Sequence, residues 1–338
     1  MIKQKPFRIW YFVVLGVCLF TGCDDRRTTD SGGEQSATEA PLVKAPSFNP
    51  DSAYAFVEKQ VSFGPRVPNT KPHVQCGDYL IAKLKEYGAA VTVQSFVATA
   101  FDGSKLQSRN IIASINPAAP KRILLAAHWD TRPFADQDST NQNKPIDGAS
   151  DGASGVAVLL EIARSMQADS AKPGTGVDLI LFDSEDYGIP EGQESEDASK
   201  VWYCLGSQYW AANKHKPNYA AYYGILLDMV GGKNAKFAKE AMSMQFAGSI
   251  MNKVWQLGNR LGYGAYFVNV DSPGITDDHI FVNQTAKIPT IDIIEYNADG
   301  DDYFGTYWHT HGDNMSVIDR KTLKAVGQTV LQTVYQEE

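Results

Sequence analysis

The stretch VDLILFDSEDYG at residues 177–188 decides the fold class of this 338-residue chain. The apolar run from Leu179 to Phe182 predicts a buried strand, and it breaks abruptly into Asp183, Glu185 and Asp186. In open α/β sheets, ligands bind beyond the carboxyl ends of the strands. Of two adjacent carboxylates at such an end, one can hold a cation while the other moves protons. The alternative is a polar strand end that turns into a solvated loop.

Segments that predict strands alternate with segments that predict helices along the rest of the chain. Strands are expected at 106–115, 122–127, 177–182, 222–230, 265–270 and 289–295. Helices are expected after 49–52, around 80–84, and at 152–166, 206–213, 240–261 and 320–336. This alternation predicts a single α/β domain with a central, mostly parallel twisted sheet and helices on both faces. We place the catalytic domain at 47–338, because no break in composition follows residue 47.

Composition excludes several classes of protein. A hydrophobic content of 43% is typical of a globular core, and a net charge of -8 without a long basic run argues against nucleic acid as a partner. Four cysteines without a CxxC pair indicate neither a disulfide scaffold nor a zinc knuckle. Cys76 and Cys204 either pair in an oxidising compartment or remain buried free thiols.

The N-terminus predicts export. Basic residues precede an apolar run from Ile9 to Phe20, which is too short to span a bilayer and indicates a signal peptide at 1–22. The run ends in LFTGC, which resembles the bacterial lipoprotein processing box and implies a lipid on Cys23; a plain signal peptide is the alternative. The polar segment 23–46 predicts a disordered tether. We therefore expect an exported lipoprotein anchored in a bacterial membrane, with its catalytic domain in the periplasm.

Side chains able to bind a metal recur where strands are expected to end. They are His128, Asp130, Asp151, Glu185, Asp186, Asp228 and His309. Such side chains converge if the strand ends are neighbours in a parallel sheet. Catalytic zinc keeps three protein ligands and one open position, and Asp151, Asp186 and His309 satisfy that count. The small residues around Asp151 (GASDGASG, 148–155) predict a sharp turn into a helix, for which an ordinary N-cap is the alternative reading.

The order of the motifs resembles one enzyme family. The motifs are HWD (128–130), GASDG (148–152), DSED (183–186), LLD (226–228), DDH (277–279) and WHT (308–310). Together they resemble the zinc-dependent glutaminyl cyclases, which are related to the dizinc aminopeptidases, over roughly residues 50–335. The resemblance implies a zinc aminopeptidase-like fold, one zinc per chain, and conversion of the N-terminal glutamine of peptides or proteins to pyroglutamate.

The resemblance also implies roles for single residues. Asp151, Asp186 and His309 would be the zinc ligands, Glu185 the general acid and base, and Asp228 and Asp277 the carboxylates that hydrogen-bond near the substrate amide. One departure is Asp186, because the family commonly has Glu at that position.

Aromatic residues are expected near the substrate. Trp202, Phe304 and Trp308 would line an apolar pocket, with burial in the core as the alternative for each. The segment 297–307 looks expanded relative to the family and would form an extra loop near the mouth of the site.

Two other functions remain open. His128, Asp151 and Asp228 could hold a second metal, as in a dizinc aminopeptidase that hydrolyses N-terminal residues with water activated by the neighbouring glutamate. Trp308 and the 277–279 motif favour the cyclase, in which His128 would be a vestigial ligand. A binding lipoprotein without catalysis is the alternative from another class, and the intact set of ligands argues against it.

Overall fold

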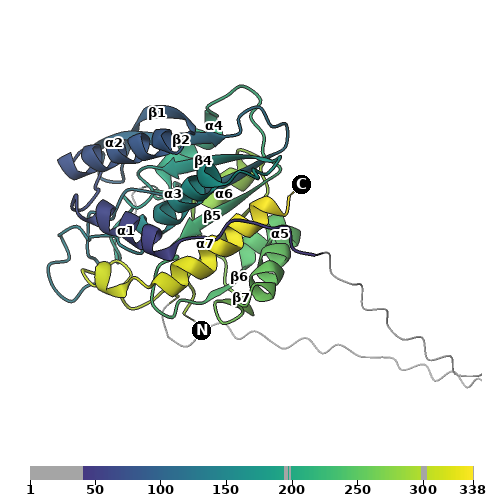
Figure 1. Ribbon diagram of the computed structural model, residues 1–338. Helices are drawn as coiled ribbons and strands as arrows, with labels where there is room; N and C mark the ends of the chain where they lie inside the picture. Colours follow the sequence, from purple (N-terminus) through teal and green to yellow (C-terminus); the bar gives the residue numbers. More distant parts are fainter. Residues whose placement is uncertain (1–40, 194–196, 198, 298–302, 338) are drawn as a thin grey trace, which may run out of the picture. The chain divides into compact units, whose positions relative to one another are not determined.

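A six-stranded mixed sheet forms the centre of the described chain (Figure 1). The computed structural model describes residues 41–193, 197, 199–297 and 303–337, and Leu42–Glu338 make one compact unit. The strand order is β1-β2-β4-β3-β5-β8. The strands are β1 (Ala90–Thr99), β2 (Lys105–Ile115), β3 (Arg122–His128), β4 (Gly176–Phe182), β5 (Tyr223–Asp228) and β8 (Thr290–Ile294).

The parallel strands end close to one level. β4, β3, β5 and β8 pair in parallel, whereas β1 and β2 join the sheet antiparallel. His128 pairs with Phe182, and Asp228 pairs with Ile294. The carboxyl ends of these strands therefore meet at one edge of the sheet, where open α/β sheets bind ligands. The predicted α/β fold with a mostly parallel sheet is confirmed.

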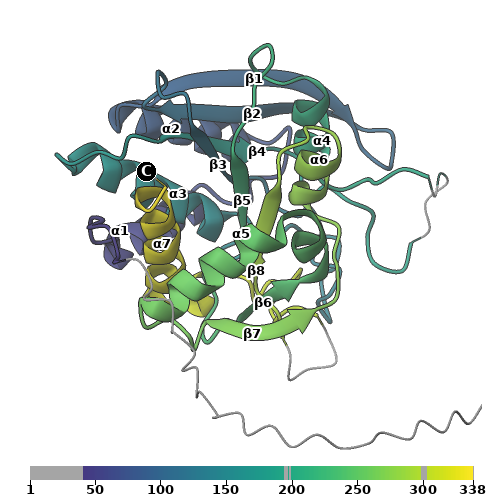
Figure 2. The same ribbon diagram turned by 90° about the vertical axis from the view of Figure 1, so that its right-hand side faces the viewer.

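Helices cover both faces of the sheet. The larger hydrophobic core lies under α1 (Pro50–Val61), α2 (Lys71–Glu86), α3 (Ala153–Ala168), α5 (Ala241–Arg260) and α7 (Arg320–Tyr335). The smaller core lies under α4 (Leu205–Ala212) and α6 (Asp278–Gln284), on the opposite face (Figure 2). Both faces are thus apolar, which explains why the central strands are nearly continuous hydrophobic runs in the sequence.

Successive side chains of each strand enter opposite cores. In β3, Leu125 belongs to the larger core and Leu124 to the smaller one. In β8, Ile291 and Ile293 belong to the larger core. Because side chains alternate along a strand, Asp292 between them points to the face that α4 and α6 cover.

Four elements were not expected from the sequence. β1 forms an edge of the sheet, and α6 is a helix of seven residues. A separate parallel pair joins β6 (Phe237–Glu240) to β7 (Phe267–Ser272), where only a strand near β7 was predicted. The 3₁₀ turn Met315–Val317 was also missed. β6, α6 and the 3₁₀ turn are too short to show a clear hydrophobic period.

The N-terminal predictions fall mostly outside the described residues. The structure does not describe residues 1–40, which include the predicted signal peptide at 1–22, Cys23 and most of the predicted tether. From Val43 onward the chain packs on α7, because the Val43 amide donates to Gln336 Oε1. Among the described residues, no helix combines the length and the hydropathy needed to cross a membrane. Cys76 and Cys204 are both buried free thiols.

Candidate active site

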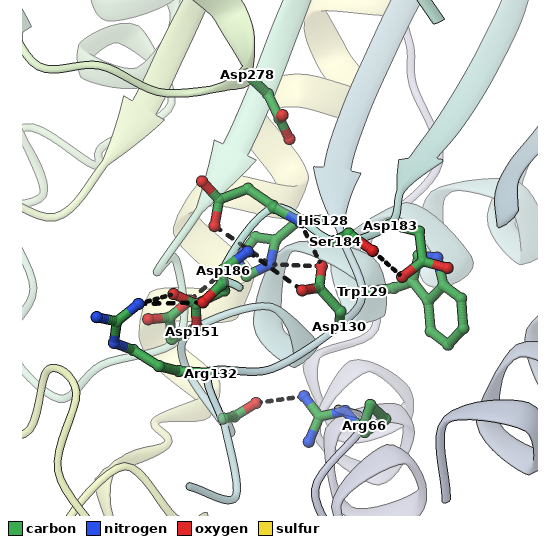
Figure 3. Close-up of polar contacts among 12 residues, drawn as sticks. Arg66, His128, Trp129, Asp130, Arg132, Asp151, Asp183, Ser184, Asp186 and Asp278 are labelled. Carbon is green, nitrogen blue, oxygen red and sulfur yellow. Dashed lines mark hydrogen bonds and ion pairs between the residues drawn. The ribbon is translucent and has the colours of Figure 1, made fainter. Parts of the chain in front are cut away.

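The turn after β4 fixes the two adjacent acids. Ser184 has φ of 57°, so the chain reverses sharply once the strand has ended. The Asp130 carboxylate then accepts the amide hydrogens of Glu185 at 3.0 Å and Asp186 at 3.2 Å (Figure 3). Both side chains are therefore held at the carboxyl edge of the sheet by a buried acid from the turn after β3.

A second turn presents Asp151 at the start of α3. Gly152 has φ of 89°, and a Cβ atom there would lie 2.7 Å from the backbone oxygen of Asp130, so only glycine fits. The Asp313 carboxylate accepts the amide hydrogens of Ser150 at 2.7 Å and of Asp151 at 3.1 Å. The backbone at Asp151 is thus held by Asp313, and the N-cap residue of α3 is Gly152 rather than Asp151.

His309 reaches the same point from the segment before α7. Its Nε2 atom lies 3.2 Å from Asp186 Oδ1 and 3.7 Å from Asp151 Oδ2. Its Nδ1 atom lies 3.6 Å from Asp136 Oδ1, an arrangement in which a carboxylate behind the ring orients a histidine ligand. The Trp308 ring stacks on the His309 ring with centroids 3.8 Å apart.

The donors of Asp151, Asp186 and His309 fit a metal ion. One ligand atom of each lies within 4.8 Å of the others, and all three residues are buried. Asp186 Oδ2 is buried without a hydrogen-bond partner, so a strong acceptor is left unsatisfied there. Two carboxylates and one imidazole are a donor set that zinc accepts, with room for a fourth ligand.

A second group of possible ligands adjoins the first. His128 Nε2 lies 3.0 Å from Asp151 Oδ1 and 3.1 Å from Asp228 Oδ1, and the three residues also meet the 4.8 Å criterion. Burial lowers the pKa of His128, but Asp228, Asp130 and Asp151 outweigh it and raise the pKa well above 6.5. The ring can therefore act as a cationic partner to the acids, or, when neutral, as a ligand.

Glu185 is enclosed between a thiol and an imidazole. The Cys204 thiol donates to Glu185 Oε1 at 3.1 Å, and Glu185 Oε2 lies 4.0 Å from His128 Nδ1. Burial raises the pKa of Glu185 well above 4.5, and the charges of Asp186 and Asp277 add to the rise against the lowering effect of His128. Burial likewise raises the pKa of Asp228 to about 7. A carboxyl with a raised pKa can both accept and donate a proton near neutral pH.

Glu185, Asp228 and the three candidate metal ligands line one cavity of about 300 Å³. Its polar wall consists of Asp151, Glu185, Asp186, Asp228, Asp277, Thr276 and His309, and its less polar wall of Tyr203, Ile275, Ile294, Phe304 and Trp308. The structure thus brings together every predicted catalytic and ligand side chain, and His128 contacts two of them.

Trp202 lies in a different cavity. It lines a space of about 600 Å³ with Lys200 and Phe281, whereas its neighbour Tyr203 lines the cavity with the acids. Phe304 and Trp308 do line that cavity, and their ring centroids are 4.8 Å apart. The extra-loop prediction for 297–307 falls partly on residues 298–302, which lie outside the described residues.

Sequence reasoning missed several residues close to the site. Cys204 and Tyr203 precede a short helix without a motif of their own. Asp292 left a clearer signal, because it interrupts the apolar run TIDII in the middle of a buried strand. An acid at such a position is costly to bury, so it indicates a specific partner.

Comparisons with known proteins agree with this geometry. The model of peptidase family M28 matches residues 110–334. A crystal structure of Bacteroides thetaiotaomicron glutaminyl cyclase bound to N-acetylhistamine is 52% identical, covers 87% of this chain and 100% of that chain, and superposes with a TM-score of 0.84. A Zn-dependent exopeptidase from Parabacteroides distasonis is 53% identical at the same coverage and TM-score.

A curated relative is more distant in sequence. Glutaminyl-peptide cyclotransferase of Dictyostelium discoideum is 25% identical over 304 residues, which is 77% of this chain and 77% of the relative. The resemblance to the zinc-dependent glutaminyl cyclases, inferred from the motifs, is confirmed. This chain, whose buried carboxylates and histidines meet at the carboxyl edge of an α/β sheet, belongs to peptidase family M28.

Proposed function

We propose that this protein is a glutaminyl-peptide cyclotransferase, which converts the N-terminal glutamine of peptides and proteins to pyroglutamate and releases ammonia. The observation that carries the proposal is the single cavity that Asp228 and Asp277 line together with Glu185. Two carboxyl groups at that position suit an amide nitrogen that leaves as ammonia. The glutaminyl cyclases among the similar structures support the same reaction.

The reaction joins two groups of the same substrate residue. The α-amino nitrogen forms a bond to the side-chain carbonyl carbon, and the bond from that carbon to the amide nitrogen breaks. Zinc, when held by Asp151, Asp186 and His309, supplies a Lewis acid for the side-chain carbonyl. Glu185 accepts the proton that the attacking amine loses and delivers a proton to the leaving nitrogen. The amine is already tethered to its target, so orientation contributes much of the rate.

The other residues of the cavity hold the substrate. Asp228 and Asp277 hydrogen-bond to the leaving amide nitrogen from the polar wall of the cavity. Phe304 and Trp308 form an apolar wall that keeps water away from the reacting carbonyl. Water exclusion favours cyclisation over hydrolysis of the same amide.

We propose one zinc per chain. Cyclisation needs no metal-activated water, because the nucleophile is an amine of the substrate. His128 makes close contacts to Asp151 and Asp228 that an imidazolium can satisfy without a second metal. This leaves Asp228 available to the substrate.

A dizinc aminopeptidase is the second candidate. The observation in its favour is that His128, Asp151 and Asp228 converge closely enough to hold another ion beside the first site. The similar exopeptidase from Parabacteroides distasonis is consistent with that chemistry. In this alternative, Glu185 would activate water for attack on a peptide bond.

The two functions give different products from the same assay. Purified zinc-loaded protein is incubated with a peptide that begins with glutamine and with a matched peptide that begins with leucine. We expect the first peptide to lose the mass of ammonia and the second to remain intact, as read by mass spectrometry. Release of free leucine without ammonia from the glutamine peptide would replace the cyclase with the aminopeptidase.

We also propose that the protein is an exported lipoprotein, anchored in a bacterial membrane through Cys23, with the catalytic domain in the periplasm. The support comes from the sequence LFTGC at the end of a short apolar run. A lipid anchor would hold the enzyme close to exported substrates.

Replacing Cys23 should release the protein from membranes. Cys23→Ser removes the thiol that would carry the lipid, so we expect the variant in the soluble fraction and the wild type in the membrane fraction. Cys76→Ser is the control, because that thiol is buried in α2. Absence of an acyl mass on wild-type Cys23 would contradict the anchor.

A further inference from the structure

The Cys204 thiol is a buried reactive group that has no part in the mechanism above. It is 0% exposed, and it donates a hydrogen bond to Glu185 Oε1 at 3.1 Å. Glu185 Oε2 lies 4.0 Å from His128 Nδ1, which is too far for a hydrogen bond. The two oxygens of this carboxyl group therefore differ, because Oε1 accepts a hydrogen bond from the thiol and Oε2 does not accept one from the imidazole.

Backbone hydrogen bonds join the start of α4 to the turn that carries Glu185. The Cys204 amide donates to the Glu185 backbone oxygen at 2.8 Å, and the next amide along the chain donates to the backbone oxygen of Ser184 at 3.0 Å. Gly206 permits this approach, because a Cβ atom there would collide with the backbone oxygen of Asp183. The backbone therefore places the thiol against Glu185.

Neither the turn nor the helix needs a cysteine at position 204. The residue has φ of 58°, a left-handed conformation that glycine adopts without the steric cost of a Cβ atom. Cys204 is the N-cap residue of α4, yet its side chain makes no capping hydrogen bond. Such a bond is the usual contribution of an N-cap side chain. The contact with Glu185 is thus the interaction that distinguishes this side chain.

The surroundings of Cys204 keep its thiol protonated. Burial raises the pKa of Cys204 well above its ordinary value, and the charges of Glu185 and Asp278 add to the rise. The side chain therefore stays an S–H group, which can donate a hydrogen bond but carries no charge. A thiol is a weak donor, so it can orient a carboxyl group without binding it as strongly as a cation would.

We propose that Cys204 is a positioning residue whose thiol holds Glu185 Oε1 and leaves Oε2 as the oxygen that moves protons. Oε2 takes the proton that the α-amino nitrogen loses and passes it to the amide nitrogen as the bond from carbon to that nitrogen breaks. The thiol itself loses no proton. The kinetic consequence rests on the proposed cyclase function. Cys204 acts only through Glu185, since it does not line the cavity.

Cys204→Ala should lower kcat by about tenfold and leave KM nearly unchanged. Alanine removes the donor, so the Glu185 carboxyl group can turn away, and misplacement of a reacting group by about 1 Å costs up to roughly a hundredfold in rate. The loss should be smaller than that, because Asp130 still holds the Glu185 amide. Cys204→Ser should restore most of the rate, because a hydroxyl group also donates. The measurement is ammonia release over a range of concentrations of a glutamine-first peptide.

Cys76→Ala is the matched control. Within the part of the chain that the structure describes, Cys76 is the other buried free thiol; it belongs to α2 and does not line the cavity. Alanine there also leaves a small void, so Tm should fall while kcat stays unchanged. Cys204→Gly is a second variant should Cys204→Ala not fold. Glycine suits the left-handed backbone and likewise lacks the thiol, so kcat should fall as it does for alanine.

A metal ligand is the alternative role for the thiol. One ligand atom of each of Glu185, Cys204 and Asp277 lies within 4.8 Å of the others. Metal analysis separates the two roles. Positioning requires the same metal content in the wild type and in Cys204→Ala, whereas a ligand role requires the loss of an ion with the thiol.

Four results would contradict the positioning role. The first is a normal kcat for Cys204→Ala with the same loss of Tm as Cys76→Ala, which assigns the thiol to stability alone. The second is a rate for Cys204→Ser as low as that for Cys204→Ala. The third is a crystal structure of Cys204→Ala in which the Glu185 carboxyl group keeps its orientation, and the fourth is an ion lost with the thiol. If the wild type does not cyclise glutamine, the proposed function fails, and the crystal structure still tests the positioning.

Discussion

Glu185→Gln is expected to lower kcat by about two to four orders of magnitude, the usual contribution of general acid and base catalysis. Glutamine keeps the size of the side chain and can still meet the Cys204 thiol through its carbonyl oxygen, but it cannot accept the proton of the attacking amine. The backbone hydrogen bond from the Glu185 amide to Asp130 is unaffected, so the turn after β4 should keep its shape. The measurement is the release of ammonia from a glutamine-first peptide at saturating substrate.

Two measurements make the result for Glu185 specific. Zinc content should equal that of the wild type, because the ligands Asp151, Asp186 and His309 are intact. Glu86→Gln is the control for a change of charge, since Glu86 is an exposed residue of α2 that pairs with Lys83. Near-normal turnover, or loss of zinc from Glu185→Gln, would mean that the roles of Glu185 and Asp186 are exchanged.

His309→Ala should abolish both zinc binding and activity. The substitution leaves two carboxylates, whereas catalytic zinc sites keep three protein ligands, so zinc should fall well below the one ion per chain expected of the wild type. The turnover should fall to the background rate, because the Lewis acid is lost with the ion. The checks are metal analysis by mass spectrometry and the ammonia assay on the same preparation.

Asp228→Asn separates the one-metal site from a two-metal site. Asp228 contacts His128 but does not belong to the group formed by Asp151, Asp186 and His309. In a cyclase with one zinc, the variant should retain its metal and lose kcat. Two tightly held ions in the wild type, one of them lost with Asp228, together with release of amino acids from ordinary peptides, would establish the aminopeptidase.

The sequence was most informative where an apolar strand ends in a polar residue. Leu179 to Phe182 form an apolar run that breaks abruptly into acids, so the carboxyl end of β4 was identifiable from the change in hydrophobicity alone. The same reasoning located the ends of β3 and β5 at His128 and Asp228. Parallel pairing then requires these ends to share an edge, which is why the candidate site could be predicted before the fold was known.

Aromatic residues were harder to assign than acids. Trp202 and Tyr203 are neighbours, yet they line different cavities. A loop has no periodic hydrophobic pattern, so the sequence does not indicate which of two adjacent side chains faces the substrate. The answer depends on the local turn, where Cys204 has φ of 58° and is the N-cap residue of α4.

The sequence by itself determined most of the alternation of strands and helices and the polar residues that follow the central strands β3, β4 and β5, because both follow from local hydrophobic pattern. Tertiary structure alone decided which buried polar groups meet. Asp292, His279 and Glu240 come from three elements, and their contacts depend on how β8, α6 and β6 pack. The strand pattern marked Asp292 as out of place, but its partners were set by the packing of distant segments, which no local pattern encodes.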